Sequence, residues 1–338
     1  MQQLTGHKAF RKEIFNITAD GFNDLALRIF QFQFEQNPFY REYCHAVNVD
    51  ATAVKDVKQI PFLPIQFFKS REIKTTLFEP EMIFESSGTT CSVNSKHFIK
   101  EIGIYEESFI NYFESSYGDS SNYCILGLLP SYLERKHSSL VWMVNALINK
   151  SKYPESGFHL YDHETLKNIL VQNEKDAKPT LLIGVTYALH DFFEKFQVHL
   201  KHTFIMETGG MKGRKAEMTR TAVHQFLKNQ ANVDQIHSEY GMTELLSQAY
   251  AKKNGIFHCP AWMKVVLRKE DDPFDIIFPG TITREAASGV INIFDLANVY
   301  SCSFIATDDI GKLYNNGSFE VMGRLDNSDI RGCSLMSI

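Results

Sequence analysis

The sequence predicts an α/β fold with a largely parallel sheet, followed by a smaller β-rich region. Between residues 82 and 241, short apolar stretches typical of strands alternate with stretches whose apolar residues recur at helical spacing. This alternation is the pattern of parallel β–α units. After residue 260 the helical stretches stop, and short β-type stretches follow one another with turns between them. We therefore expect an α/β core over residues 1–260 and a β-rich subdomain over residues 261–338.

The region before residue 82 is predicted to be helical up to a proline-containing connector. Apolar residues at helical spacing predict a helix over residues 22–36. The stretch NPFYREYC (37–44) predicts a short helix that begins at its proline. The stretch IPFLPIQFFKS (60–70) contains two prolines and predicts an extended connector.

The remaining elements follow from the two kinds of periodicity. Strands of the alternating region are expected at residues 82–85, 123–129, 180–187 and 203–210, and a strand followed by a loop is expected at residues 233–241. Helices between them are expected at residues 102–116, 138–150, 188–196 and 215–229. Strands of the β-rich region are expected in the stretches MKVVLR, FDIIF, GVINIFDL, CSFIATD and GSFEVMG.

Composition and charge argue against several classes of protein. The chain of 338 residues is 44% hydrophobic and has a net charge of −5, without the basic excess of a general nucleic-acid binder. The 6 cysteines are irregularly spaced and form no CxxC pair, which argues against a disulfide framework and a structural zinc site. The N-terminus has no apolar leader, and no stretch is long and apolar enough to span a bilayer. We therefore expect a cytoplasmic protein with reduced thiols, without a nucleic-acid partner or a membrane span.

The stretch FESSGTTCSVNSKHF (84–98) contains the first candidate site. Glycine lets the backbone turn and approach a ligand closely, and successive amides and hydroxyls can donate to phosphate oxygens. The Walker A spacing is missing, so this is not a P-loop of that kind. Taken alone, the stretch is equally compatible with a solvated turn. The residues concerned are Ser86, Ser87, Gly88, Thr89 and Thr90.

The stretch EYGMTE (239–244) is the second candidate, expected at the end of a strand and the start of a helix. Ligands of open α/β sheets bind at the carboxyl ends of the strands. There Tyr240 can stack on a base, Thr243 offers a hydroxyl, and Glu244 can hold a hard cation such as Mg²⁺. Alternatively, Thr243 caps the helix and Glu244 is favoured by the helix dipole.

The third candidate lies in residues 306–332. The turn residues at 315–317 predict a β-hairpin. Before this turn, Asp308 or Asp309 could bind the hydroxyls of a ribose, and after it Arg324 and Asp326 could close over a nucleotide. The hairpin and the ligand role are compatible with each other.

These motifs occur in a characteristic order. SSGTT, TGG before a helix, YGMTE, DDIG and GRLD together resemble the adenylate-forming superfamily of acyl-, aryl- and luciferase-type ligases, over roughly residues 60–332. Several longer stretches resemble the LuxE-type acyl-protein synthetases of bacterial luminescence operons, and more distantly the phenylacetate–CoA ligases. The stretches are NPFYREYC, IPFLPIQFFKS, ESSGTT, PSYLERKHSSLVWMVN, ETGGMKGRK and HSEYGMTELLSQAY. The fold implied is the large N-terminal domain of adenylate-forming enzymes, with parallel-rich sheets and helices and then a small β-rich subdomain.

The resemblance implies roles for the matching positions. The Ser/Thr/Gly stretch would handle the phosphates of ATP, Thr243 would contact the α-phosphate, and Glu244 would hold Mg²⁺. Asp309 fits the ribose-binding position best because it lies two residues before Gly311, and Asp308 stays an alternative. The nucleotide-binding residues implied in this way are Ser86, Ser87, Gly88, Thr89, Thr90, Gly209, Gly210, Tyr240, Gly241, Thr243, Asp309 and Arg324.

The sequence departs from the superfamily pattern at two places. The common form of the loop is SSGTTG followed closely by Pro-Lys, whereas here Cys91 replaces the glycine and Lys96 comes later. The chain also ends soon after the GRLD segment, so we expect the mobile C-terminal domain of the larger ligases, with its adenylation lysine, to be absent. LuxE-type proteins are similarly short, which favours them over a CoA ligase that depends on that domain.

The resemblance implies ATP-dependent activation of a carboxylic acid, in this family a fatty acid, followed by transfer of the acyl group to a cysteine near the C-terminus. Cys333 occupies that place, and Arg331 beside it could lower its pKa. Cys91 is a rival nucleophile, and His137 is a candidate residue of the wall of the acyl or nucleotide pocket.

A partner acyl-reductase or an acyl-carrier protein would receive the acyl group. An acyl-CoA ligase and a non-catalytic nucleotide-binding subunit remain alternatives, and the acid, the final acceptor and the oligomeric state stay open.

Overall fold

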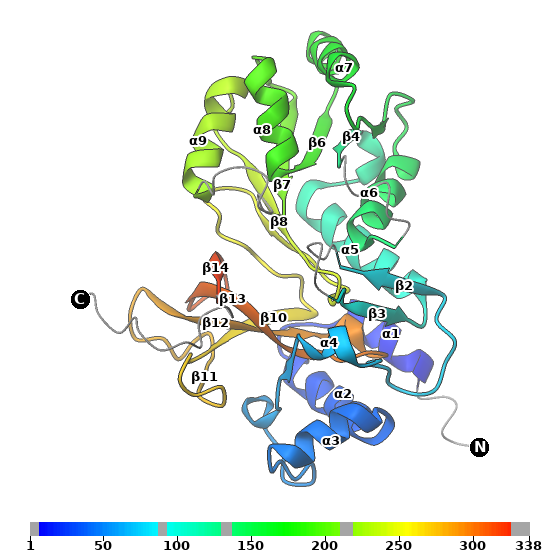
Figure 1. The fold of residues 1–338 in the computed structure, drawn as a ribbon, viewed down its shortest axis with the longest axis vertical. Helices are drawn as coiled ribbons and strands as arrows, with labels where there is room; N and C mark the ends of the chain where they lie inside the picture. The colour runs from blue at the N-terminus through cyan, green and yellow to red at the C-terminus, as the bar shows by residue number, and fades with distance from the viewer. Residues whose placement is uncertain (1–6, 87–92, 130–136, 210–218, 326–338) are drawn as a thin grey trace.

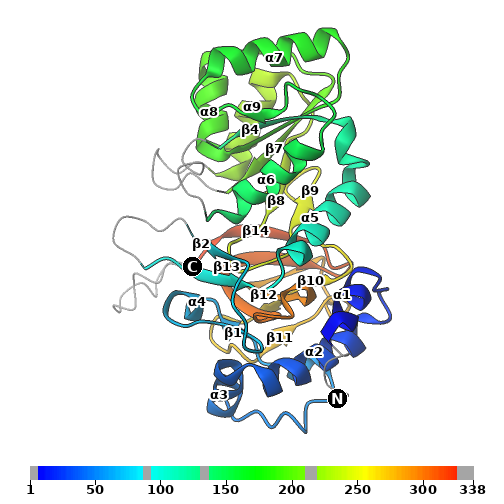
Figure 2. The ribbon, with the colours of Figure 1, turned by 90° about the vertical axis from the view of Figure 1, so that its right-hand side faces the viewer.

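The protein consists of two stacked lobes, each built around a sheet (Figure 1). The computed structural model describes residues 7–86, 93–129, 137–209 and 219–325. The upper lobe in Figure 1 contains β4, β6 and β7 with helices α6 to α9, and the lower lobe contains β10 to β14 with helices α2 to α4. Strand β8 runs from the upper lobe toward the lower one, and Figure 2 shows β13 and β14 directly beneath it.

The upper sheet has the order β5-β4-β6-β7-β8-β9 in the described residues. All neighbouring pairs from β5 to β8 are parallel, and only β9 is antiparallel. This confirms the predicted α/β fold with a parallel-rich sheet. The strands are β4 (Cys124–Leu128), β5 (Gly157–Phe158), β6 (Thr180–Val185), β7 (Thr203–Thr208), β8 (His237–Tyr240) and β9 (Ala249–Ala251).

Helices cover both sides of this sheet, with α8 and α9 on one side and α5 and α6 on the other (Figure 1). They are α5 (Ile102–Tyr117), α6 (Ser139–Lys150), α7 (His163–Lys175), α8 (Thr186–Lys195) and α9 (Arg220–Ala231), with η2 (Ser120–Asn122) before β4. Four of these helices were expected from their periodicity, and α7 was missed. It is capped by the side chain of Asp162, and Leu166 and Leu170 form its buried stripe.

The lower sheet has the order β1-β13-β12-β10-β11, and β14 pairs with β13. It is antiparallel except for β1, which lies parallel to β13. The β-type stretches after residue 260 therefore form strands as predicted. The strands are β1 (Leu63–Pro64), β10 (Met263–Arg268), β11 (Ile276–Ile277), β12 (Ala286–Asp295), β13 (Phe304–Tyr314) and β14 (Phe319–Arg324), with η3 (Leu296–Asn298) after β12.

The N-terminal helices pack against the lower sheet. Phe22 of α2 and Phe62 both meet the ring of Phe294 edge-on, at centroid distances of 6.0 and 4.8 Å. The buried Gln33 donates to the backbone oxygens of Asn298 and Val299. Both ends of the chain therefore contribute to this lobe, and the domain division at residues 260 and 261 stays a prediction. The helices and the turn before β1 are α1 (His7–Phe15), α2 (Phe22–Gln36), α3 (Pro38–Ala46) and η1 (Val57–Gln59).

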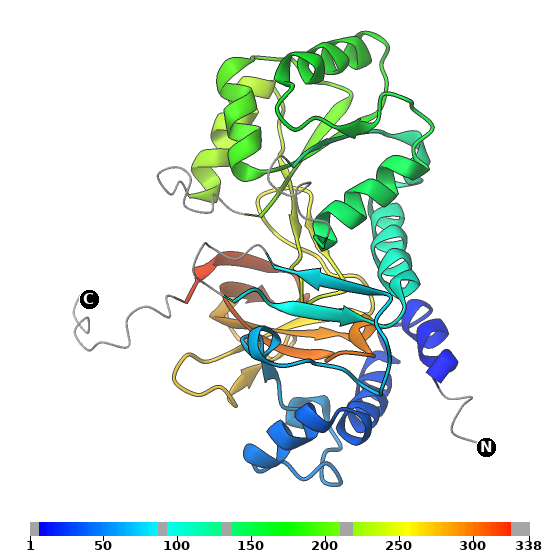
Figure 3. The ribbon, with the colours of Figure 1, turned by 45° about the vertical axis from the view of Figure 1, so that its right-hand side comes forward.

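The proline-containing connector contains more regular structure than expected. Its residues form β1 and the short helix α4 (Phe67–Ser70), because β1 finds a pairing partner in β13 that the local sequence does not reveal. The hairpin of β2 (Met82–Glu85) and β3 (Lys96–Ile99) follows it. Figures 1 and 3 show this hairpin (cyan) between the two lobes.

The predicted β13–β14 hairpin is confirmed. Its turn contains Gly317 at φ 82°, in the left-handed region that glycine adopts at no steric cost. The backbone N–H of Gly317 donates to the oxygen of Tyr314, which closes the turn. In the part of the chain that the structure describes, no helix has the length and apolar character needed to cross a membrane.

Candidate functional site

The end of β8 meets the β13–β14 hairpin through a cluster of three predicted site residues. The Tyr240 hydroxyl donates to Oδ2 of Asp309 at 2.7 Å, and Nε of Arg324 donates to Oδ1 of the same carboxylate at 3.1 Å. Asp309 and Arg324 are register partners across the hairpin. The cluster therefore joins the carboxyl end of the parallel sheet to the lower lobe.

Burial strengthens the interactions in this cluster. Tyr240 and Asp309 are buried, and desolvation together with the negative charge of Asp309 raises the pKa of Tyr240. Desolvation alone would lower the pKa of Arg324, but the neighbouring Asp309 raises it. The phenol thus stays protonated and the guanidinium charged, so both donate to the Asp309 carboxylate.

The structure separates the two acidic candidates of β13. Successive side chains of a strand point to opposite faces, so Asp308 and Asp309 cannot share one site. The carboxylate of Asp308 accepts a hydrogen bond from Nε2 of Gln66 at 2.5 Å, beside β1. Asp309 is the residue that meets Tyr240 and Arg324.

The expected helix after EYGMTE is absent, and that prediction is wrong. Residues 241–248 form an irregular connection between β8 and β9. Its backbone groups bond to distant side chains rather than to a helical ladder: Asn298 donates to the oxygen of Glu244, and Asp295 accepts from the amides of Leu246 and Ser247. Thr243 therefore does not cap a helix, and Glu244 does not lie in a first helical turn.

Glu244 is a buried carboxylate at this connection, with 6% of its surface exposed. Desolvation raises its pKa, while a hydrogen bond from Ser95 and the charges of Arg324 and Lys69 oppose the rise. A buried carboxylate beside the hydroxyl-bearing Thr243 offers the hard oxygen donors that Mg²⁺ prefers, and a divalent cation would offset the buried charge. The residues present therefore fit the ion.

The two ends of the Ser/Thr/Gly stretch are joined beside Glu244. The amide of Ser86 donates to the oxygen of Ser95, and the amide of Ser95 donates to Oγ of Ser86. Ser86 thus lies at the base of the predicted phosphate loop. The rest of the predicted loop lies outside the described residues, namely Ser87, Gly88, Thr89, Thr90 and Cys91.

Lys96 begins β3 and is 54% exposed. Its Nζ lies 3.8 Å from the carboxylate of Glu85, its cross-strand neighbour in β2. Ser95 and His97 on either side of it are buried, so Lys96 lies on the other face of the strand. The described contacts of Lys96 are thus with the hairpin and not with Glu244.

The carboxyl ends of β7 and β8 bring glycines and buried carboxylates together. Gly209 has φ 73°, and its oxygen accepts from the Thr186 hydroxyl at 3.0 Å. At Gly241, a Cβ would lie 2.4 Å from Oε1 of Glu239, so a larger residue would displace this buried carboxylate. Gly210, the second predicted glycine of TGG, lies outside the described residues.

Sequence reasoning missed the buried acids at this edge. Glu207 accepts from Thr186 and faces Nε2 of His224 at 3.4 Å, and Glu239 accepts from the hydroxyl of Thr208. Glu207 lies within β7 and Glu239 within β8, and a single glutamate in a strand gave no distinctive signal, because burial of these side chains depends on the neighbouring strands. The hydrogen bond from His224 and then that from Thr186 offset the desolvation of Glu207, and the Thr208 hydroxyl opposes that of Glu239.

A comparison with protein-family models matches residues 18–337 to LuxE, acyl-protein synthetase. This match covers nearly the whole chain. The chain belongs to the LuxE acyl-protein synthetase family. The resemblance seen in the motifs is thereby confirmed, and the LuxE family is one of acyl-activating, AMP-forming ligases. A comparison with curated proteins finds no match.

Solved structures show the fold of this LuxE family member. A 2-hydroxyisobutyryl-CoA ligase in the postadenylation state with 2-HIB-AMP has a TM-score of 0.66 at 10% identity, covering 91% of this chain and 68% of that ligase. The o-succinylbenzoate CoA synthetase of Bacillus subtilis, bound with a product analogue, has a TM-score of 0.51 at 15% identity. That match covers 75% of this chain and 49% of the synthetase. The fold is therefore that of the large N-terminal domain of adenylate-forming ligases, as predicted.

His137 lies beside the base of the predicted phosphate loop in this LuxE fold. Its ring Nδ1 is 3.0 Å from the oxygen of Ile83, and its own backbone oxygen accepts from the amide of Glu85. The residue is exposed and directly precedes the buried Ser138, which caps α6. This position is next to Ser86, and the role of His137 in a pocket stays a prediction.

The cysteines of the described residues are poor nucleophiles. Cys44, Cys124 and Cys302 are buried, as expected for apolar core residues, and Cys259 is half-buried. Burial raises the pKa of each of these thiols, to about 12 for Cys44 and Cys259. Cys333 and its rival Cys91 lie outside the described residues.

Glu239 makes the stability of this LuxE family member depend on pH. Desolvation raises its pKa from 4.5 to about 7, and the nearby Glu207 adds to the rise. The folded protein therefore binds a proton that the unfolded chain releases, and stability is lost as the pH rises through 7. Glu239→Gln keeps the shape and removes the charge. The unfolding free energy of Glu239→Gln minus that of the wild type should therefore increase by up to about 3 kcal/mol as the pH rises from 4.5 to 8.

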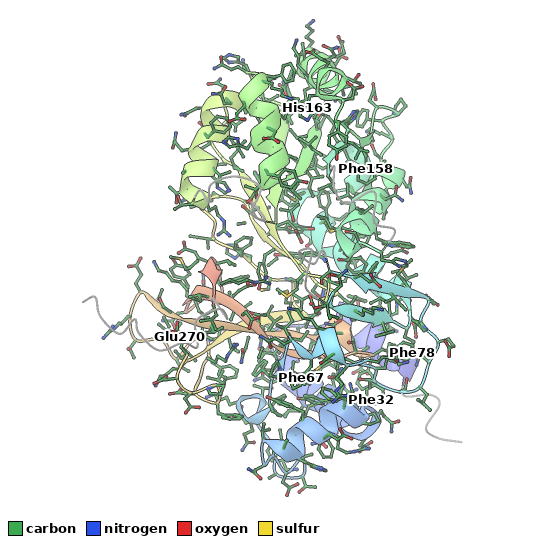
Figure 4. The ribbon with its side chains drawn as sticks, viewed as in Figure 1. Phe32, Phe67, Phe78, Phe158, His163 and Glu270 are labelled. Atoms are coloured by element: carbon green, nitrogen blue, oxygen red, sulfur yellow. The ribbon has the colours of Figure 1, made fainter. Side chains whose placement is uncertain are left out.

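Chemical denaturation at a series of pH values measures this difference. Glu270→Gln is the matched control, because Glu270 is exposed on the connection between β10 and β11 (Figure 4). Its difference from wild type should stay flat with pH. A Glu239→Gln difference that is equally flat would contradict the raised pKa.

Proposed function

We propose that this protein activates a carboxylic acid with ATP as an acyl-adenylate and then transfers the acyl group to a protein thiol. The observation that carries the proposal is the cluster of Tyr240, Asp309 and Arg324, which joins both lobes next to the buried Glu244. Membership of the LuxE family supports the same chemistry.

The cluster offers complementary groups for a nucleotide. The ring of Tyr240 and the glycine edge at Gly209 and Gly241 would hold the adenine, and the Asp309 carboxylate would accept hydrogen bonds from the ribose hydroxyls. Arg324 would contact the ribose or a phosphate. The hydroxyl-rich stretch that begins at Ser86 and the Thr243 hydroxyl would donate to phosphate oxygens.

Adenylation then follows from positioning and charge compensation. An oxygen of the substrate carboxylate attacks the α-phosphorus of ATP, the bond to the β-phosphate breaks, and pyrophosphate leaves. Mg²⁺ held by Glu244 would supply positive charge to the phosphates when bound. Arg324 and the hydroxyl donors would stabilise the negative charge that develops on the α-phosphate.

Transfer to a thiol completes the proposed reaction. A thiolate attacks the acyl carbon, the bond to the phosphate oxygen breaks, and AMP leaves. Cys333 is the proposed acceptor, and the raised pKa values of the described cysteines support a nucleophile elsewhere in the chain. We propose a fatty acid as the substrate, and a partner acyl-reductase or carrier protein as the next acceptor.

Exchange of labelled pyrophosphate into ATP tests the adenylation step. The expected result is exchange that requires both Mg²⁺ and an added carboxylic acid, with fatty acids of several chain lengths as the first panel. A folded protein that binds ATP yet exchanges no pyrophosphate with any acid would favour a non-catalytic nucleotide-binding subunit. Release of acyl-CoA when CoA is added would favour an acyl-CoA ligase.

Intact-protein mass spectrometry tests the thiol step. After incubation with ATP, Mg²⁺ and a fatty acid that supports exchange, the wild type should gain one acyl mass that hydroxylamine removes. Cys333→Ala should lose this adduct and keep the exchange activity, whereas the control Cys259→Ala should keep both. An adduct that survives in Cys333→Ala and disappears in Cys91→Ala would assign the thiol to Cys91.

A further inference from the structure

The connection between β8 and β9 carries Thr243 and Glu244, yet it forms neither a helix nor a strand. A segment without its own hydrogen-bond ladder keeps one conformation only when groups outside it satisfy its backbone. Asn298 holds the oxygen of Glu244, and Asp295 holds the amides of Leu246 and Ser247. The Leu245 amide bonds to the oxygen of Met242 within the connection, and a further contact from outside, made by His97, reaches the carbonyl of Thr243.

His97 is a buried imidazole on β3, with 1% of its surface exposed. Its Nδ1 lies 2.8 Å from the backbone oxygen of Thr243. Because a carbonyl oxygen only accepts hydrogen bonds, Nδ1 must carry the proton. Desolvation lowers the pKa of His97 to about 4, so the ring is neutral and its other nitrogen, Nε2, is unprotonated.

Packing fixes the orientation of this ring. Phe68 of α4 meets the His97 ring edge-on at a centroid distance of 5.8 Å. The cross-strand neighbour of His97 on β2 is the buried Phe84. Its Nε2 is buried and has no hydrogen-bond partner among the described residues. The polar contact of His97 is therefore directed to one acceptor, the Thr243 carbonyl.

The same stretch of chain also holds the side chain of Glu244. Ser95 precedes His97 by two residues, both are buried, and Ser95 hydrogen-bonds the Glu244 carboxylate. Alternation along the strand places both on one face, with Lys96 on the other. The start of β3 thus holds the backbone before Glu244 through His97, and the carboxylate of Glu244 through Ser95. Ser95 also bonds to Ser86 and so joins the two ends of the predicted phosphate loop.

We propose that His97 is a positioning residue that sets the Thr243–Glu244 backbone for Mg²⁺ and phosphate through its Nδ1–H donor. This proposal rests on the proposed function and goes beyond it, because it assigns a role to a buried residue whose polar contact is with the Thr243 backbone. Its contribution is the hydrogen bond, and an apolar ring-sized side chain cannot replace it.

Three variants at this position separate the hydrogen bond from simple packing. The amide nitrogen of asparagine can occupy the place of Nδ1, that of glutamine lies closer to the place of Nε2, and leucine fills volume without a donor. His97→Asn should retain pyrophosphate exchange within about 3-fold of wild type. His97→Gln and His97→Leu should lose about 10- to 100-fold in kcat, the range for second-layer partners of metal ligands.

Two further readouts report on positioning directly. The Mg²⁺ concentration for half-maximal exchange should rise in His97→Leu and stay near wild type in His97→Asn, while KM for the acid changes little. ¹⁵N spectra of histidine-labelled protein without ligands should contain a signal from a neutral ring protonated at Nδ1 that disappears in His97→Asn, while the Nδ1–H signal of His137, which faces the oxygen of Ile83, stays. His163→Asn is the matched control, at the start of α7 at the far end of the upper lobe (Figure 4).

The outcomes distinguish this proposal from the proposed function. A wild type without exchange would overturn the proposed function, and the ¹⁵N spectrum would still test the His97 hydrogen bond. Wild-type exchange with equal losses in the Asn and Leu variants, or with no loss in a folded Leu variant, would overturn the positioning role. If His97→Leu fails to fold, the comparison of His97→Asn with His97→Gln and the protonation of the wild-type ring decide the question.

Discussion

Glu244→Gln is expected to lower the rate of acid-dependent pyrophosphate exchange about 10²–10³-fold. Glutamine keeps the volume of the side chain and an acceptor for Ser95, but it removes the charge that would hold Mg²⁺ beside Thr243. Because the buried carboxylate has a raised pKa, removing its charge relieves desolvation, so the folded state should not lose stability. The expected signature is thus low activity in a protein at least as stable as wild type.

Rates of exchange over a range of Mg²⁺ concentrations, together with unfolding midpoints, check this expectation. Glu270→Gln is again the control, since it removes one negative charge from the exposed connection between β10 and β11. Excess Mg²⁺ should restore part of the rate of Glu244→Gln if weaker ion binding is the cause. Full activity of Glu244→Gln at low Mg²⁺ would remove this residue from the list of candidate ligands.

Asp309→Ala is expected to lower kcat/KM for ATP about 10²-fold, mainly through a higher KM for ATP. The Asp309 carboxylate accepts from both Tyr240 and Arg324, so its removal leaves the guanidinium of the 68% exposed Arg324 without this partner and frees the buried tyrosine ring. A hydrogen bond to a charged group contributes about 1.5–3 kcal/mol, and because the Arg324 side chain is exposed, the main loss is that of the buried bond between Tyr240 and Asp309. The effect should therefore extend to folding stability as well.

The neighbouring acid provides the comparison. Asp308 lies on the opposite face of β13 and bonds to Gln66, so Asp308→Ala should change KM for ATP less than 3-fold. Binding of ATP by titration calorimetry and exchange kinetics with varied ATP measure both variants. A larger effect on ATP from Asp308→Ala than from Asp309→Ala would reverse the choice between the two residues.

Periodicity was enough to predict most elements of the fold. The helix at residues 22–36 and the strand at 82–85 have the predicted bounds, because each has a regular apolar pattern that its tertiary contacts reinforce. The connection after Tyr240 was mispredicted, because Asn298 and Asp295 lie about fifty residues further along the chain and satisfy the backbone groups that a helix would have paired. Local sequence contains no sign of such partners.

The candidate site was predicted by motif order and then refined by the structure. Tyr240, Asp309 and Arg324 were named from separate motifs, and the fold brings them into contact. The choice between Asp308 and Asp309 required the register of β13 with β14. His97 was missed, because a single histidine in a strand gives no signal until its partner, the carbonyl of Thr243, is known.

The pairing of β1 with β13 has a consequence for how the protein folds. Leu63 lies beside Ile305, and the nearby bond from Gln66 to Asp308 spans 242 residues of sequence. Contacts of such long separation form late, because the chain must close a large loop before they contribute. During synthesis, β1 and α4 emerge long before their partner strand exists, whereas the parallel sheet can form first. Asp309 therefore reaches Tyr240 only when the lower sheet closes, so that assembly of the proposed nucleotide site should report completion of folding.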